Sequence, residues 1–251
     1  MSERQSITDV RTVAVGAGWR NYVYVLIDTD RGITGLGEAS LGGQTHAVLG
    51  MIEDLKPLLI GADPFRIEHI WQQAYRHAFW HGGVTFLSAL SGIEVALWDI
   101  KGQALGVPIW RMMGGLVRDR IRAYANGPRG DTPDELARSA VDLVAKGYGA
   151  LKFTPFDATP ILAGRRAIDA AVAKVRAVRE AVGPEVELMV DGHGRLSPAV
   201  AVRVAEALAG FNLMFFEEPC LPEQVPAMVR VAKKSPIPIA TGERRYSPGS
   251  S

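Results

Sequence analysis

The chain has 251 residues, of which 47% are hydrophobic and 22% charged, and its formal net charge at pH 7 is +1. This length is sufficient for one large α/β domain or two smaller ones, and the composition is that of an ordinary globular protein. The small net charge gives no electrostatic reason to expect nucleic acid or a membrane as the main partner.

The cysteine content and the N-terminus point to a reducing compartment. Cys220 is the only cysteine, which excludes an internal disulfide bond. The N-terminal MSERQSITDVRTVAV carries charges where a secretory signal peptide needs an apolar core. No stretch of about twenty apolar residues predicts a membrane span. We therefore expect a cytoplasmic protein.

The first part of the sequence predicts a small α+β unit. Two β-rich runs, VRTVAV and YVYVLIDTDRGITGLGEAS, are interpreted as strands, with a turn at residues 30–32 inside the second run. Apolar residues at helical spacing then predict three helices, over 45–59, 65–78 and 85–105. The sequence GVP after the third of these segments ends its helix.

From residue 120 onward, apolar runs alternate with amphipathic segments. The runs are IRAYANG, GALKFTPF, VELMVDGHG, LMFFEEP and IPIATGE, and the predicted helices cover 133–146, 162–182, 198–209 and 223–233. This alternation indicates a parallel sheet whose crossovers are helices. Four of the five runs end in polar residues, as expected at the active-site edge of a (β/α)8 barrel. A doubly wound sheet also binds ligands at that edge.

Three acids close successive apolar runs at equal spacing. Asp191, Glu217 and Glu243 follow one another at intervals of 26 residues, and one βα unit of a barrel takes roughly thirty residues. The acids are therefore predicted on adjacent strands at the same height. Carboxylates that converge in this way repel one another unless a cation compensates them. Oxygen ligands with room for water and substrate favour Mg²⁺ over zinc. Alternatively, each acid is a capping or loop residue of its βα turn.

Two of the polar groups lie in one short motif, LMVDGHGRLSP. Side chains two residues apart on a strand face the same way, so Asp191 and His193 are predicted to emerge together from the end of a strand over 186–190. The flanking Gly192 and Gly194 allow close backbone approach there.

Four motifs together give the sequence a family resemblance. ALWDIKGQALGVPIWRMMGG looks like a link between two domains, and VDGHGR, FFEEP and ATGER look like metal-ligand strand ends. With them the chain resembles the enolase superfamily, in particular the mandelate racemase/muconate lactonizing enzyme group and its galactonate-dehydratase-like acid-sugar dehydratases. The resemblance implies an enolase-like α+β capping domain over 1–119 and an incomplete TIM-barrel domain over 120–251.

The resemblance also implies a reaction and a metal site. The reaction is abstraction of the proton alpha to a substrate carboxylate, with Mg²⁺ stabilising the enediolate, followed by loss of water from an aldonate or aldarate. The implied metal ligands are Asp191, Glu217 and Glu243. Glu218 should face away from Glu217, so we expect it to be structural or to support the ligands.

Two further residues are candidates for catalysis. His193 resembles the histidine that donates a proton to the departing hydroxyl, a task that suits a near-neutral imidazole; the alternative is a hydrogen-bonded loop or core histidine. Lys152 aligns with the first lysine of the K-x-K pair of related racemases. It would contact the substrate carboxylate or a metal ligand, or form an ordinary salt bridge. Thr154 takes the place of the second lysine and cannot act as a base, which argues against a two-base racemase.

Candidate substrate-binding residues lie mainly in the N-terminal part. The segments GWRNY and AFWHGG resemble the specificity loops of the capping domain, and their candidates are Trp19, Arg20, Trp80 and His81. Packing is the alternative role for these aromatic residues. Arg195 binds substrate or caps a neighbouring strand. We interpret Cys220, His46, His69 and His77 as structural.

The resemblance ends just after Glu243. Only five barrel strands are predicted, and the histidine–aspartate dyad that related dehydratases place on later strands as the base is missing. We therefore expect a truncated or frame-shifted copy, or a fragment of a longer enzyme, with weak or no turnover. The alternatives are a non-catalytic remnant that binds metal or substrate, and a racemase or epimerase. The expected partner is a small acid sugar, and a homo-oligomer is possible in this group.

Overall fold

The computed structural model describes residues 5–77, 79–80, 82–156 and 163–246. The chain divides into two compact units, Met1–Asp119 and Arg120–Ser251, called unit 1 and unit 2 below.

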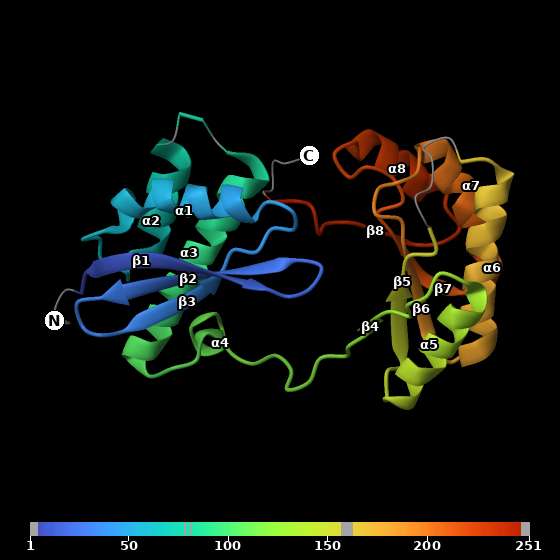
Figure 1. Ribbon diagram of the computed structural model, residues 1–251, viewed down its shortest axis with the longest axis horizontal. Coiled ribbons are helices and arrows are strands. Elements are labelled where there is room, and N and C mark those ends of the chain that lie inside the picture. Colours follow the sequence, from blue (N-terminus) through green and yellow to red (C-terminus); the bar gives the residue numbers. More distant parts are fainter. Residues whose placement is uncertain (1–4, 78, 81, 157–162, 247–251) are drawn as a thin grey trace. The chain divides into compact units, whose positions relative to one another are not determined.

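Unit 1 contains an antiparallel sheet in the order β1-β2-β3 (Figure 1). Its strands are β1 (Ile7–Gly16), β2 (Asn21–Thr29) and β3 (Thr34–Glu38), and its helices are α1 (Thr45–Leu59), α2 (Ile67–His77), α3 (Gly83–Leu105) and α4 (Ile109–Met112). The predicted turn at 30–32 joins β2 to β3. Alternate residues of β2, namely Val23, Val25 and Ile27, are buried against α1 and α3, as the period of a strand with one covered face requires.

β3 and α3 approach so closely that their backbones touch. A Cβ atom built on Gly37 would overlap the carbonyl oxygen of Gly92, and one on Gly35 would overlap that of Ala96. Only glycine, which has no Cβ, permits this contact between a strand and a helix. The two glycines of β3 therefore set how deeply the sheet packs onto α3.

α3 is also the one helix among the described residues that is long and apolar enough to cross a membrane, by length and composition alone. The sequence-based expectation that no stretch would qualify does not hold for this helix. Nine of its residues, including Leu90, Ile93 and Ile100, are buried inside unit 1. The core of unit 1 therefore accounts for its apolar composition.

Unit 2 contains a five-stranded parallel sheet in the order β4-β5-β6-β7-β8. The strands are β4 (Ala125–Asn126), β5 (Ala150–Phe153), β6 (Glu187–Asp191), β7 (Leu213–Glu217) and β8 (Ile239–Ala240), and the helices are α5 (Pro133–Ala145), α6 (Arg165–Val182), α7 (Pro198–Leu208) and α8 (Val225–Lys234). The predicted fold class, an α+β unit followed by a partial (β/α)8-type barrel with five strands, is confirmed.

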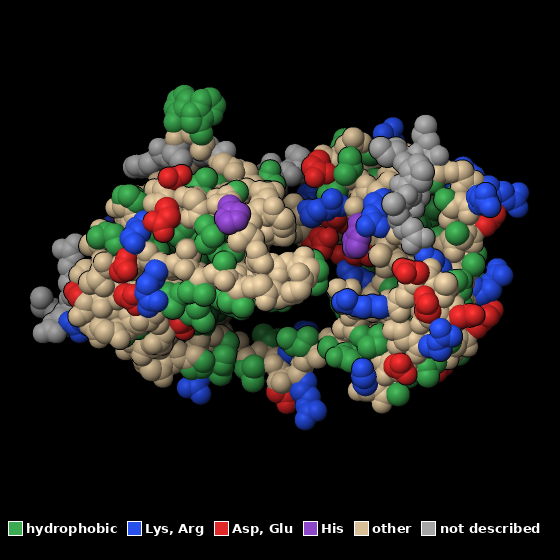
Figure 2. Space-filling model, viewed as in Figure 1, with side chains coloured by type: hydrophobic (Ala, Val, Ile, Leu, Met, Phe, Trp, Pro, Cys, Tyr) green, Lys and Arg blue, Asp and Glu red, His purple; other side chains and the backbone are tan. Residues whose placement is uncertain are grey.

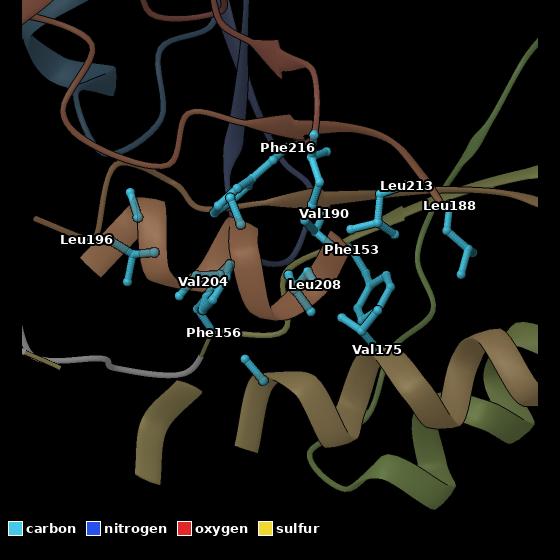
Figure 3. Close-up of a cluster of buried hydrophobic side chains, with 14 of the residues drawn as sticks. Phe153, Phe156, Val175, Leu188, Val190, Leu196, Val204, Leu208, Leu213 and Phe216 are labelled. Carbon is cyan, nitrogen blue, oxygen red and sulfur yellow. The ribbon is translucent and has the colours of Figure 1, made fainter. Parts of the chain in front are cut away.

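The core of unit 2 lies between one face of this sheet and the helices. Figure 3 shows Phe153, Val190 and Phe216 reaching from β5, β6 and β7 toward Val175 of α6 and Val204 of α7. Because side chains alternate along a strand, the residues next to these apolar ones belong to the opposite face. That opposite face carries the candidate site.

The element bounds differ from the sequence-based expectation mainly at the ends. The two outer strands of unit 2, β4 and β8, are only two residues long. The four-residue helix α4 was not predicted, since so short a segment has no measurable apolar period. The helix predicted over 65–78 begins at Ile67, and residue 78 lies outside the described residues.

Candidate functional site

Two of the predicted acids stand side by side at the carboxyl edge of the sheet. Asp191 ends β6 and Glu217 ends β7, and the two residues are direct partners in the register of these strands. Glu217 also pairs with Ala240, the last residue of β8. Glu243 lies three residues beyond that strand, so the prediction that it ends a strand at the same height as the other two acids is wrong. Figure 2 shows acidic, basic and histidine side chains gathered on this part of unit 2.

Lys152 of β5 joins the two carboxylates. Its Nζ donates hydrogen bonds to Oδ2 of Asp191 at 3.0 Å and to Oε2 of Glu217 at 2.5 Å. Both Lys152, which is 7% exposed, and Asp191, which is 3% exposed, are buried. Two acids from neighbouring strands thus converge on one cationic centre.

The environment keeps Lys152 protonated. Burial opposes its charge, but the hydrogen bonds to Glu217 and Asp191 and the charges of these two acids outweigh burial and raise the pKa of Lys152 above its ordinary value. A lysine held in this form is a poor general base at neutral pH. The structure therefore shows Lys152 in salt bridges with Asp191 and Glu217, which agrees both with the predicted contact to metal ligands and with the alternative of an ordinary salt bridge.

Glu243 is exposed to the negative charges of Asp191 and Glu217. Glu243 is an exposed residue, but partial loss of hydration, followed by the charges of Asp191, Glu218 and Glu217, raises the pKa of its carboxyl group, and Lys152 offsets only part of this effect. As the side chains are placed, the described residues contain no group of three or more His, Cys, Asp or Glu side chains that could hold a metal ion. The chemistry of Asp191, Glu217 and Glu243 still fits a hard cation, which binds carboxylate oxygens. Asp191 and Glu217 already share the ammonium of Lys152, and their negative charges disfavour the ionised form of Glu243.

Replacing Glu243 by Gln is expected to raise the unfolding temperature of the metal-free chain at pH 7. Because the folded-state pKa of Glu243 lies above its ordinary value of 4.5, ionisation of Glu243 lowers the stability of the fold as the pH rises above 4.5. The amide carries no charge, so its advantage should shrink as the pH falls below 4.5. Thermal unfolding in EDTA at several pH values measures the difference. A variant that melts below the wild type at pH 7 would contradict the charge repulsion inferred here.

His193 contacts Asp191 from the turn after β6 and not, as predicted, from a continuation of the strand. β6 ends at Asp191, and His193 lies in the following turn with a φ of 48°, so the strand alternation on which the prediction relied does not extend to it. Its backbone N–H donates to Oδ1 of Asp191 at 2.9 Å, and its Nε2 lies 3.4 Å from Oδ2. The imidazole is 45% exposed and therefore open to solvent or a ligand.

The loops after β6 and β7 are joined by their backbones. The N–H groups of Gly192, Gly194 and Leu196 donate to the carbonyl oxygens of Glu217, Glu218 and Pro219 in turn, at 2.8, 2.7 and 3.2 Å. A Cβ on Gly192 would lie 2.7 Å from the carbonyl oxygen of Glu218, so this contact requires glycine. The predicted close backbone approach at Gly192 is thus explained by the neighbouring loop.

Glu218 and Arg195 have protein partners. Glu218 is completely buried and pairs with Arg244, which separates it from Glu217 and fits the supporting role expected of it. Nη1 of Arg195 donates to the carbonyl oxygen of Phe156 at 2.6 Å and so ties the loop after β6 to the loop after β5. Substrate binding by Arg195 stays a prediction.

A cavity of about 350 Å³ in unit 2 is bordered by Lys152 and His193, both of which contact Asp191. Its lining includes Lys152, Thr154 and His193, together with Asn126 and Arg129, which sequence reasoning missed. Asn126 ends β4, and a polar residue at the end of an apolar run is the signal that could have revealed it. The volume falls in the range of small-molecule sites.

The candidates in unit 1 fall into two groups. Trp19 and Arg20 line a groove of about 470 Å³ together with His46, which sequence reasoning assigned a structural role. The guanidinium of Arg20 lies 4.6 Å from the centre of the Trp19 ring. Trp80 is 84% exposed and contacts Phe79 edge-on. His81 lies outside the described residues.

Comparison with known proteins places both units in one family. The mandelate racemase/muconate lactonizing enzyme N-terminal domain matches residues 4–114, and the enolase C-terminal domain-like family matches residues 135–250. A D-galactonate dehydratase from Verminephrobacter eiseniae is 42% identical over 241 residues, which are 96% of this chain and 62% of the relative. The chain therefore spans less than two thirds of that curated relative.

Solved structures give the same result. A member of the enolase superfamily from Salmonella Typhimurium is 33% identical with a TM-score of 0.90, and the match covers 96% of this chain and 68% of that one. An enolase from Pantoea ananatis with bound D-gluconate and Mg is 31% identical with a TM-score of 0.86, over 97% of this chain and 66% of that one. The chain belongs to the enolase superfamily, in its mandelate racemase/muconate lactonizing enzyme group.

Proposed function

We propose that this chain carries the metal- and substrate-binding end of a Mg²⁺-dependent acid-sugar dehydratase that acts on an aldonate or aldarate. The observation that carries the proposal is the convergence of Asp191 and Glu217 on one cationic centre, beside a cavity lined by His193. The relative named D-galactonate dehydratase and the solved relative with D-gluconate and Mg support this substrate class.

In this proposal Asp191, Glu217 and Glu243 hold the metal. Magnesium, when bound, would supply positive charge that stabilises the negative charge developing on the substrate carboxylate. The protonated Lys152 adds a fixed positive charge at the same edge, where it neutralises two of the acids and orients their oxygens.

His193 would act as the general acid. Its exposed imidazole lines the cavity and lies 3.4 Å from a carboxylate oxygen of Asp191, within reach of a ligand held there. In the elimination a base takes the proton of the α-carbon, the freed electron pair forms a carbon–carbon double bond, the neighbouring carbon–oxygen bond breaks, and His193 gives its proton to the hydroxyl, which leaves as water. The resulting enol becomes a 2-keto-3-deoxy acid.

The base that takes the α-proton is not assigned in this chain. His193 is the single histidine in the sequence of unit 2, and the proposal uses it as the acid. We therefore expect the isolated chain to bind Mg²⁺ and an acid sugar but to release 2-keto product only slowly.

Calorimetric titration with Mg²⁺ tests the proposal. The wild type should bind one ion, and Asp191→Asn should lose this binding. Glu187→Gln is the matched control, because Glu187 begins the same strand and its carboxylate pairs with Arg122 at 3.9 Å. Release of 2-keto product from D-galactonate, D-gluconate and other acid sugars is then measured with and without Mg²⁺. A wild type that binds no Mg²⁺, or an Asp191→Asn variant that binds as the wild type does, would overturn the proposal.

A further inference from the structure

The carboxylate of Glu218 is buried, charged and next in sequence to a proposed metal ligand. Its residue is 0% exposed, and its backbone has a φ of 34°, in the region that non-glycine residues seldom adopt. A buried carboxylate is costly unless it is paired. The pairing here comes from the segment that follows β8.

Arg244 supplies that pairing with two nitrogen atoms. Its Nε and Nη2 lie 2.6 and 2.5 Å from Oε2 of Glu218, and the hydroxyl of Thr241 donates to Oε1 at 3.4 Å. Among the described residues, these are the side-chain hydrogen bonds that connect segment 241–246 to the rest of unit 2. Glu243 lies inside this segment, directly before Arg244.

The same arginine packs against the turn that carries His193. A Cβ on Gly194 would come within 2.5 Å of Nη2 of Arg244, and the N–H of Gly194 donates to the carbonyl oxygen of Glu218 at 2.7 Å. Three segments, those that follow β6, β7 and β8, therefore meet at the Glu218–Arg244 ion pair. Each of them begins at or contains one of the proposed ligands Asp191, Glu217 and Glu243.

We propose that Arg244 is a positioning residue that, through its ion pair with buried Glu218, fixes the segment carrying Glu243 against the end of β7. Without this connection, repulsion from Asp191 and Glu217 would drive Glu243 away from the other two acids. The consequence for metal affinity rests on the proposed function. The fixing of the segment is a property of the metal-free chain and is tested separately.

Hydrogen exchange of the amides in segment 241–246 tests the fixing in EDTA. Arg244→Gln should speed their exchange by about tenfold or more, because the segment opens locally without its ion pair. The double variant Glu218→Gln/Arg244→Gln should speed exchange equally without leaving a buried charge unpaired. It replaces Arg244→Gln in the test if that single variant does not fold. Arg244→Lys should restore part of the protection.

Arg179→Gln is the matched control. Arg179 is a half-buried arginine of unit 2 that, like Arg244, makes several hydrogen bonds, but its acceptors lie outside segment 241–246: they are the carbonyl oxygens of Phe211, Gly183, Val186 and Asn212. Its loss should lower the unfolding temperature without faster exchange in segment 241–246. Loss of a residue that supports a metal ligand typically weakens metal binding by 10–100-fold, so Arg244→Gln should weaken Mg²⁺ binding by about tenfold and Arg179→Gln should leave it unchanged.

The outcomes separate this inference from the proposed function. Unchanged exchange in Arg244→Gln and in Glu218→Gln/Arg244→Gln, or equal acceleration by Arg179→Gln, overturns the positioning role. Faster exchange in Arg244→Gln with unchanged Mg²⁺ affinity also overturns it, because the position of segment 241–246 would then not affect metal binding. If the wild type binds no Mg²⁺ while Arg244→Gln still speeds exchange, the proposed function fails and the fixing of the segment stands.

Discussion

Replacing Lys152 by Met is expected to lower the free energy of unfolding of the metal-free chain by about 3 kcal/mol, the low end of the range for breaking a buried ion pair. The substitution removes the ammonium that Asp191 and Glu217 share and leaves two neighbouring carboxylates with their mutual repulsion. The low end applies because the side chain of Glu217 is still partly exposed. Because the pKa of Lys152 is raised in the folded state, its stabilising effect is fully present at neutral pH and is lost only at strongly alkaline pH.

Magnesium should recover part of this loss, because a bound cation can take over the neutralisation of Asp191 and Glu217. Urea unfolding in EDTA and in excess Mg²⁺ measures both effects. Lys233→Met, a change at an exposed lysine of α8, is the control and should stay within about 0.5 kcal/mol of the wild type under both conditions. If Lys152→Met unfolds like the wild type in EDTA, the shared lysine does not stabilise the fold.

Replacing Gly37 by Ala is expected to lower the free energy of unfolding by about 3 kcal/mol, the upper end of the usual cost of overpacking. The added methyl group would overlap the carbonyl oxygen of Gly92. Backbone cannot rotate away as a flexible side chain can, so β3 and α3 must move apart. The loss of contact between them would expose part of the unit 1 core.

A Gly→Ala substitution in α1 should instead raise the free energy of unfolding. Gly50 is exposed, lies inside that helix and has open space around its Cβ position. Gly50→Ala should therefore raise the free energy of unfolding by about 0.5–1 kcal/mol, the helix-propensity difference between the two residues. Chemical denaturation of both variants provides the comparison. Equal effects of the two substitutions would show that β3 can move away from α3 at little cost.

The order of the elements could be predicted because each has a clear apolar period or a turn signal. The helix predicted over 45–59 is α1 with the same bounds, since its apolar residues repeat at helical spacing throughout. The equal spacing of the acids placed Asp191 and Glu217 on neighbouring strands, and the register pairs them directly. These features are encoded in local sequence and in the fixed length of a βα unit.

Contacts that depend on where long side chains reach could not be predicted in the same way. The position of Lys152 on a strand is clear from the sequence, but its bond to both acids depends on the direction of a flexible four-carbon chain. The Glu218–Arg244 pair joins residues 26 positions apart, although a glutamate at the buried end of a strand signals that a counter-charge is needed. The left-handed residue His193 lies between Gly192 and Gly194, whose N–H groups bond the next loop, and no local pattern reveals those bonds.

The hydrogen bonds between the loops after β6 and β7 have a consequence for engineering and for sequence divergence. Three N–H groups over residues 192–196 depend on three carbonyl oxygens over residues 217–219, so neither loop keeps its conformation when the other is exchanged. A chimera with a related enzyme should therefore transplant both loops as one cassette. A substitution that changes the backbone conformation of one loop should preserve the fold only together with a matching substitution in the other loop.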